Sequence, residues 1–470
     1  MSNPGDLADL TAGELLAGYG SGAFTPVEAL VAVHARIDTV NAGINAIIAE
    51  DRAAALRTAQ QSAGRWAEHA PLSALDGVPL TIKDNLHAAG LPATWGSRLY
   101  RDFVPEADEP PVERLRKAGA VFIGKTNVPE FTLQGYTDNL LFGITQNPLA
   151  PGMTPGGSSG GGAAAVAAGI GPIALGTDGG GSLRRPAAHC GLFAIKPSIG
   201  QVARAGGFAQ ILADFEVIGP IARTPGDLRA AFDVLAGLDQ RDARSFATLA
   251  ANVLFSQTPR IGYFNTLGAA PVDPRITRAS NDFAAALAAA GCRIENIAAP
   301  FDLERVNAAW GTVAAAGLAW HLSSQPEASA LIGDNARATA ERGRAISASD
   351  YLNAWGDCLA IRAEAARLFD DFDLLLCPTT AAIAWPAAEP FPPLIDGRPA
   401  GPRGHAIFTA WMNVAGLCAL SIPVATTPDA GGIGMQLVAA PGRDRALLDF
   451  LATLPAAAMA PRQTIQGRPS

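Results

Sequence analysis

Short apolar runs alternate with helical stretches along the first half of the chain, and this alternation restricts the fold more than any other feature. The run 78–82 is bounded by turn residues and has the length of a buried strand. A helical pattern follows over 112–119, and 121–124 is a second strand-like run. Gly-rich turns then separate further apolar segments as far as about residue 235. The order strand, helix, strand predicts an α/β fold, with a large mixed, twisted sheet covered by helices on both faces.

The two ends of the chain add helices and further strands. Residues 1–70 carry helical patterns, with capping-box spacing at Thr25–Glu28, and predict an N-terminal helical layer. Residues 270–370 are Ala-rich and helical in pattern. Strand-like runs return at 373–378, 420–423 and 435–438. We therefore predict a single domain overall, in which the helical segment 1–70 packs on an α/β domain of residues 71–460.

The composition argues against several classes of protein. The chain has 470 residues, 49% of them hydrophobic, and a formal charge of −8. An acidic surface repels phosphate backbones, so nucleic-acid binding is not expected. No signal peptide is visible, and the most apolar stretch, 163–175, is too short to span a bilayer, so we expect no membrane contact and a cytoplasmic location. The five scattered cysteines show no zinc-ligand spacing, and we expect neither metal nor cofactor.

A lysine, Lys83, directly follows the strand-like run 78–82. Lysines are rarely buried unless they are paired or functional. One interpretation is a salt-bridged lysine at a strand end. The other is a desolvated lysine whose lowered pKa allows it to act as a base near neutral pH.

A Gly-rich segment, Thr154–Gly162, surrounds Ser158 and leads into an Ala-rich helical pattern. It lacks the Lys-Ser/Thr pair of a phosphate-binding P-loop. Residues 156–160 also fit G-x-S-x-G, the nucleophile elbow of α/β-hydrolases, which requires an acidic residue and a histidine further along. Beyond it lie His189, His321 and His405, none in a recognisable context. The elbow stays open as an alternative.

A second Gly-rich segment places Ser182 directly after three glycines, at 179–181. Bare backbone N–H groups beside a hydroxyl suit an oxyanion hole with the nucleophile at its edge, although a flexible turn has the same composition. A base-capable lysine, a serine among glycines and a second serine beside an oxyanion loop are together the parts of an acyl-transfer site.

These segments resemble the motifs of the amidase signature family. The motifs G-x-P-x-x-x-K-D, P-G-G-S-S-G-G and G-T/S-D-x-x-G-S-x-R-x-P-A stand here at 77–84, 155–161 and 176–187. The two serines lie 24 positions apart, as in the family, and blocks at 124–131 and 192–198 are also similar. The resemblance covers residues 25–235 strongly and 370–455 loosely.

The resemblance implies a mechanism at the level of residues. Ser182 matches the nucleophile, Ser158 the bridging serine that the family holds through a cis peptide bond, and Lys83 the neutral base. This Ser–Ser–Lys triad would cleave a carboxamide through an acyl-enzyme, giving a carboxylate and ammonia or an amine. The backbone N–H groups of Gly179, Gly180, Gly181 and Ser182 would hold the oxyanion. Supporting positions are matched by Ser159, Asp178 and Arg184.

Two positions depart from the usual family pattern. Gly179 replaces a Thr- or Ile-type residue, which predicts a looser oxyanion loop. Arg185 stands where many members have an apolar residue and where some that act on acidic amides have an arginine. We favour a surface or structural arginine paired with a carboxylate of the scaffold, with substrate binding as the alternative.

The substrate pocket is expected in three variable segments, at 131–136, 310–322 and 405–415. Their aromatic residues are candidates for an apolar lining, although each alone is more typical of a core position: Phe131, Tyr136, Trp310, Trp320 and Trp411. Of these, Phe131 and Tyr136 are our substrate-binding candidates, together with Arg185.

Two rival functions compete with a small-molecule amidase. One is the A-type component of an amidotransferase, which supplies ammonia from glutamine and needs a second protein as partner; residues 201–207 differ from the arginine–aromatic run expected there. The other is a catalytically inactive relative that serves as a binding protein, against which the intact triad positions argue. The expected partner is a small-molecule amide, and a homodimer is an arrangement that the sequence leaves open.

Overall fold

The apolar runs of the chain become strands of one mixed sheet. The computed structural model describes residues 7–249, 254–256, 258–325 and 327–460. Within them the main sheet has 11 strands. In spatial order these are β1 (Ile47–Ala49), β3 (Val121–Thr126), β2 (Pro79–Lys83), β4 (Ile173–Asp178), β6 (Val217–Ala222), β5 (Phe193–Lys196), β12 (Cys418–Thr427), β13 (Gly431–Ala439), β9 (Leu374–Pro378), β7 (Arg260–Tyr263) and β8 (Arg293–Asn296). A separate short sheet pairs β10 (Leu394–Ile395) with β11 (Arg398–Pro399).

The sheet contains both parallel and antiparallel pairs. Strand β2 runs parallel to β3 and β4, and β7 runs parallel to β8 and β9. The strands between them, from β4 to β9, pair antiparallel. Because parallel neighbours end at the same edge of a sheet, the end of β2 at Lys83 lies near the end of β4 at Asp178. This edge positions the site described below.

The N-terminal segment is mostly helical, as predicted, with α2 (Ala12–Ser21), α3 (Pro26–Ile44) and α4 (Arg52–Ala67). The predicted capping box is present: the Thr25 hydroxyl accepts from Glu28 N, and the Glu28 carboxylate accepts from Thr25 N. The all-helical prediction is wrong at β1, which pairs antiparallel with β3. A strand of 3 residues is too short to show a periodic pattern, so the sequence gives no signal for it.

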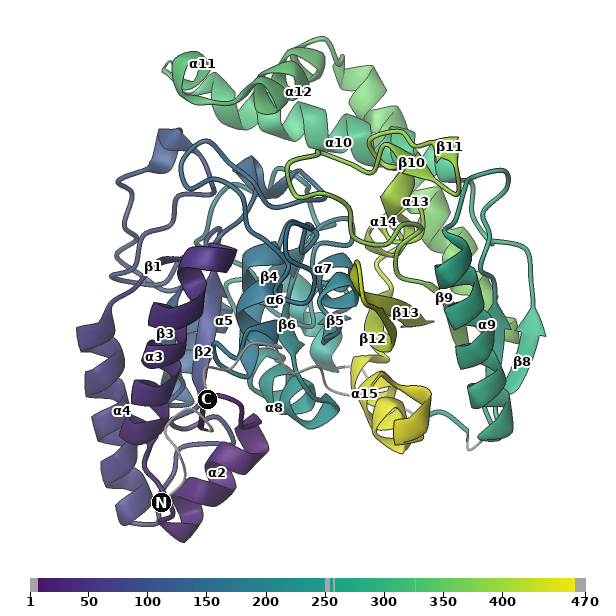
Figure 1. The fold of residues 1–470 in the computed structure, drawn as a ribbon. Coiled ribbons are helices and arrows are strands. Elements are labelled where there is room, and N and C mark those ends of the chain that lie inside the picture. Colours follow the sequence, from purple (N-terminus) through teal and green to yellow (C-terminus); the bar gives the residue numbers. More distant parts are fainter. Residues whose placement is uncertain (1–6, 250–253, 257, 326, 461–470) are drawn as a thin grey trace.

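Helices cover both faces of the sheet, which confirms the predicted α/β class (Figure 1). One face packs against α5 (Pro110–Lys117), α8 (Pro225–Leu235), α9 (Pro274–Ala289) and α15 (Asp444–Thr453). The other packs against α3, α6 (Gly160–Ala167) and α7 (Arg184–His189) at one end, and against α10 (Leu303–Ser323), α13 (Ala348–Asp371) and α14 (Ala410–Val414) at the other. None of the described helices is long and apolar enough to cross a membrane.

The region 270–370 is largely helical, as its Ala-rich pattern predicts. It adds α11 (Ala328–Leu331) and α12 (Asp334–Arg344), which lie with α10 at one end of the molecule, far from α4 (Figure 1). The exception is β8, whose mostly polar sequence at the sheet edge carries no apolar run. The three strand-like runs predicted after residue 370 are confirmed as β9, β12 and β13.

Candidate active site

Lys83 lies at the end of β2 with its amino group enclosed by protein. The residue is 1% exposed, and Nζ hydrogen-bonds with Ser158 Oγ at 2.8 Å and with Thr177 Oγ1 at 2.8 Å. No described carboxylate forms an ion pair with it, so the salt-bridged interpretation is wrong. Burial lowers the pKa of Lys83 to about 7, although the negative charges of Glu216 and Asp178 oppose this change. Much of the amine is therefore neutral at neutral pH.

Ser158 lies in the loop before α6, and its side chain faces the lysine. The Gly157–Ser158 peptide bond is cis, which is what the family resemblance implies. Ser159 anchors this loop through two bonds: its N–H donates to Ser182 O at 3.1 Å, and its hydroxyl donates to Thr177 O at 3.1 Å. The loop thus ties the bridging position to the segment that carries the second serine.

Ser182 lies between β4 and α7 and faces a cavity. The residue is 5% exposed, and its hydroxyl makes no hydrogen bond with any described residue. Three backbone N–H groups beside it, those of Gly179, Gly180 and Ser182 itself, also have no partner within the described part of the chain. Such groups can stabilise a negatively charged oxygen next to a nucleophile.

The carboxylate of Asp178 holds the loop that carries these groups. It is fully buried, accepts from Gly181 N at 2.6 Å and Leu183 N at 3.1 Å, and pairs with Arg184 at 3.0 Å. Burial alone would raise the pKa of Asp178, but the Arg184 charge outweighs it and holds the pKa well below its usual range. Because the Gly181 N–H is already bonded, our prediction of Gly181 in the oxyanion hole is wrong.

Two side chains from distant segments fix the peptide planes of the same loop. Trp310 Nε1 donates to Gly179 O at 2.7 Å, and Thr409 Oγ1 donates to Gly180 O at 2.7 Å. In a trans peptide the N–H points opposite to the C=O, so each bond also aims the following N–H. A Cβ on Gly179 would lie 2.4 Å from a Leu212 methyl group. The predicted looser loop is therefore wrong, since Leu212 fills the space of the missing side chain.

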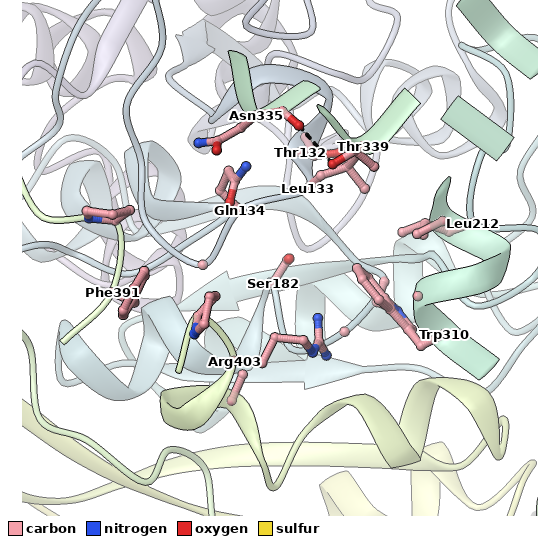
Figure 2. A pocket seen from close by; sticks show the side chains of 18 of the residues that line it. Thr132, Leu133, Gln134, Ser182, Leu212, Trp310, Asn335, Thr339, Phe391 and Arg403 are labelled. Carbon is pink, nitrogen blue, oxygen red and sulfur yellow. Dashed lines mark hydrogen bonds between the residues drawn. The ribbon is translucent and has the colours of Figure 1, made fainter. Parts of the chain in front are cut away.

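A cavity of about 440 Å³ opens beside Ser182 (Figure 2). We call the residues that bear or brace the two serines the catalytic floor: Lys83, Ser158, Thr177, Asp178, Gly179, Gly180, Gly181, Ser182 and Arg184. The outer wall comprises the other cavity-lining residues, which are Arg185, Leu212, Glu216 and residues from the segments 132–135, 310–314, 335–342 and 390–406. Figure 2 shows Ser182 near the centre, with Trp310 and Leu212 on one side and Phe391 on the other.

The aromatic candidates mostly do not line this cavity. Phe131 is fully buried, and its ring packs edge-on against Trp95 at 5.4 Å, so its substrate-binding role is a wrong prediction. Tyr136 lines an adjoining hollow with Asp138 and Asn335 rather than the cavity itself, so its substrate-binding role stays a prediction. Of the other aromatic residues, Trp411 lies in the core, Trp320 is exposed and Trp310 lines the cavity. The sequence gives no signal for the lining segments 335–342 and 390–403, because they carry no motif.

The nucleophile-elbow alternative lacks its histidine. None of the described histidines hydrogen-bonds with Ser158, whose hydroxyl contacts the lysine. His321 hydrogen-bonds with Tyr100 at 2.8 Å, and the ring nitrogens of His189 and His405 have no partner in the described residues. The geometry thus favours lysine over histidine as the group that receives a proton.

Comparison with known proteins agrees with this geometry. The profile of the amidase family matches residues 28–448. The chain is 33% identical over 468 residues to an acylamidase of Rhodococcus erythropolis, covering 93% of each chain. It is 33% identical over 470 residues to the A-type component of the glutamyl-tRNA(Gln) amidotransferase of Thermus thermophilus, covering 93% of this chain and 95% of the other. A bacterial aryl acylamidase structure superposes with a TM-score of 0.85 at 28% identity, covering 93% and 94% of the two chains.

The chain belongs to the amidase family, and it is an amide-hydrolysing enzyme. Its sheet and both helical layers are those of the amidase signature fold. The family match spans the catalytic floor and also the segments of the outer wall.

Proposed function

We propose that the protein hydrolyses a small-molecule amide through an acyl-enzyme on Ser182, with Ser158 and Lys83 as the proton relay. The observation that carries this proposal is the buried lysine, which has no ion pair in the part of the chain that the structure describes and whose Nζ lies 2.8 Å from Ser158 Oγ. A lysine with a pKa of about 7 supplies a base at neutral pH without a histidine. A hydroxyl and three N–H groups that have no hydrogen-bond partner among the described residues supply the nucleophile and its oxyanion hole.

Acylation begins with the Ser182 hydroxyl. Its oxygen attacks the amide carbon while its proton passes to Ser158, whose own proton passes to the lone pair of neutral Lys83. The carbonyl oxygen becomes negative and is held by the N–H groups of Gly179, Gly180 and Ser182. The tetrahedral intermediate then collapses, the carbon–nitrogen bond breaks, and the relay returns the proton to the leaving nitrogen. Ammonia or an amine departs and leaves an ester on Ser182.

Deacylation repeats these steps with water as the nucleophile. The relay takes a proton from water, the hydroxide attacks the ester carbon, and the same N–H groups hold the second oxyanion. Collapse of this intermediate breaks the bond to Ser182 Oγ, which regains its proton. The products are a carboxylic acid and the free enzyme, so lysine, serines and water suffice for a complete cycle.

A panel of aliphatic, aryl and acidic amides tests the proposed activity. The purified protein should release amine or ammonia from at least one class and should react with a fluorophosphonate, a general probe of activated serines. An inactive binding relative predicts neither release of amine nor reaction with the probe. If folded protein releases no amine from any class and does not react with the probe, the proposal is contradicted.

The relatives also support a second candidate, the glutamine-hydrolysing component of an amidotransferase, because several of them carry that name. Glutamine presents an ammonium group as well as a carboxylate. The acidic residue that lines the cavity, Glu216, is already paired with Arg204 at 2.6 Å and is not free to bind an ammonium group. We therefore favour the small-molecule amidase. Glutamine hydrolysis as efficient as that of the best amide in the panel would reverse this preference.

A further inference from the structure

The cavity beside Ser182 carries positive charge that the described residues do not neutralise by ion pairs. Three of its lining residues are arginines, Arg185, Arg342 and Arg403, and none of them pairs with a described carboxylate. Among the described lining residues, the one acidic side chain is Glu216, which belongs to the Arg204 ion pair. An arginine that lacks a protein counter-ion is unusual in a partly closed cavity, because desolvation penalises an unpaired charge.

Arg185 is the most enclosed of the three. It is 6% exposed, and its one side-chain hydrogen bond to a described residue runs from Nη2 to Gly157 O at 3.2 Å. Its Nε has no partner within the described residues. Burial, and then the charge of Arg403, lowers the pKa of Arg185 to about 9, which leaves the guanidinium charged at neutral pH. The ion pair expected for a structural arginine is absent from the described chain, so most of its donors stay free.

Arg403 reaches the same cavity from the other end of the chain. Its Nε donates to Asn307 Oδ1 at 3.0 Å, and its guanidinium lies over the Trp310 ring, 4.2 Å from the centroid. Stacking on a flat ring orients the guanidinium plane and leaves the terminal nitrogens unpaired. The same Trp310 donates a hydrogen bond to Gly179 O, so the position of the Arg403 guanidinium is fixed relative to the oxyanion loop.

A carboxylate on the substrate would supply the counter-ion that Arg185 and Arg403 lack among the described residues. Guanidinium groups bind carboxylates through paired, charge-assisted hydrogen bonds, whereas a neutral amide offers no counter-ion. His405, also in the cavity lining and 2% exposed, has both ring nitrogens without a partner in the described chain, which adds a further donor without an acceptor. The chain's net charge of −8 opposes long-range capture of anions, so the preference must come from local contacts.

We propose that the substrate is an amide that also carries a carboxylate, and that Arg185 and Arg403 bind this carboxylate. This inference rests on the proposed amidase function and adds the substrate class to it. Arg342 is not included, because it lies on the exposed side of α12 and already bonds to Thr339.

The test uses matched substrates. One series consists of linear primary amides that end in a carboxylate, with two, three or four methylene groups between the two ends. The other replaces the carboxylate with a methyl ketone, which has a similar shape and no charge. We expect wild-type kcat/KM to favour the best acidic amide by about tenfold to a hundredfold, the range of one charged hydrogen-bonded contact. Equal values for both series would overturn the inference.

Substitution then assigns the preference to residues. Arg185→Leu and Arg403→Leu should each lose about tenfold to a hundredfold on the acidic amide and little on the ketone. Arg57→Leu is the matched control, because it removes one positive charge from an exposed position of α4 outside the cavity. Equal losses on both series would assign the arginines to the reaction itself and overturn a carboxylate-binding role.

A binding measurement separates this inference from the catalytic proposal. Calorimetry with Ser182→Ala should detect the acidic amide and not the ketone, and Arg185→Leu in that background should abolish the difference. If Ser182→Ala still turns over substrate, the catalytic proposal fails while the binding preference can still be read. If wild type labels with a neutral fluorophosphonate but Ser182→Ala binds both amides equally, the carboxylate inference fails and the catalytic proposal stands.

Discussion

The catalytic floor and the outer wall of the cavity are built in opposite ways. The floor lies at the ends of β2 and β4, is almost fully buried, and holds its side chains in place by a continuous hydrogen-bond network. Most of the outer wall comes from helices and loops that lie more than a hundred residues after Ser182 in the sequence. It includes exposed side chains such as that of Asn335. One wall residue, Trp310, bonds directly to the floor through Gly179 O.

This difference separates chemistry from selectivity. The floor contains groups that every amide would need, namely a base, a nucleophile and an oxyanion hole. The wall contains groups that distinguish amides, such as the ring of Phe391 and the guanidinium of Arg403, which forms no ion pair with a described carboxylate. We therefore expect substitutions in the floor to affect all substrates by large factors, and substitutions in the wall to change the ranking of substrates.

The largest effect is expected for Ser182→Ala, which removes the attacking oxygen. Activity should fall by at least about 10⁴-fold on every amide, because the remaining groups cannot form an acyl-enzyme. Amine release and thermal unfolding of the same preparation measure activity and folding together. Ser323→Ala, an exposed serine at the end of α10, is the control and should behave as wild type. Substantial activity in folded Ser182→Ala protein would remove Ser182 from the mechanism.

Lys83 should come next in size. Lys83→Ala should cost about 10²–10⁴-fold, the usual contribution of a general base, and Lys83→Arg should not restore activity because arginine keeps its proton. Since the neutral amine is the active form and the pKa of Lys83 is about 7, activity should fall about tenfold per pH unit below this value and level off above it. An active Lys83→Arg enzyme, or a flat acid limb, would contradict a lysine base.

Asp178 extends the contrast between floor and wall to stability. Asp178→Asn leaves Arg184 charged and unpaired in a fully buried position, which should reduce the free energy of unfolding by about 3–5 kcal/mol. The wall variant Asn335→Ala should change it by less than about 0.5 kcal/mol. Because the folded-state pKa of Asp178 is depressed, its contribution is present at neutral pH and is lost as the pH falls through that low value. Urea unfolding at neutral and acid pH measures the effect of each substitution on the free energy of unfolding and its pH dependence. If both variants lose the same free energy of unfolding, Asp178 does not stabilise the catalytic floor.

The smallest effect is expected at the contact between the two regions. Trp310→Phe keeps a ring beneath Arg403 but removes the Nε1 donor to Gly179 O. Loss of one neutral hydrogen bond is worth about 1 kcal/mol, so kcat should fall by about fivefold, similarly for acidic and neutral amides. A selective loss on acidic amides would mean that Trp310 acts through Arg403 instead.

The floor could be predicted from the sequence because its residues lie in two short glycine-rich segments and at one strand end. Lys83, Ser158 and Ser182 stand out by local composition, but their roles, and those of Asp178 and Arg184, come from the resemblance to the family motifs. Gly181 was assigned wrongly because N–H direction depends on the carboxylate of Asp178, a side-chain contact that composition does not encode. The buried strands of the sheet could also be predicted from local sequence, because their apolar runs are uninterrupted.

The wall could be predicted only in part: residues 132–135, 310–314 and 405–406 lie in the segments expected to form the pocket, whereas 335–342 and 390–403 carry no sequence signal. Arg185 is a substrate-binding candidate from its position in the third motif, but Arg403 lies more than two hundred positions further along, in no segment expected to form the pocket. Thr409 bonds to Gly180 O across 229 positions, with no periodic signal for that contact. Phe131 was misassigned because an aromatic side chain in a loop segment is equally suited to a core or a pocket, and only packing against Trp95 decides between them.

The pH dependence of fluorophosphonate labelling, with the adduct located by mass spectrometry, probes the Ser–Ser–Lys relay without a substrate. It reports the nucleophile and its base in one experiment. We predict a single adduct on Ser182, formed at a rate that rises through pH 7 as Lys83 loses its proton, with no adduct in Ser182→Ala and a greatly slowed one in Lys83→Arg. An adduct on Ser158 or elsewhere, or a labelling rate in Lys83→Arg equal to that of wild type, would contradict a relay from Lys83 to Ser182.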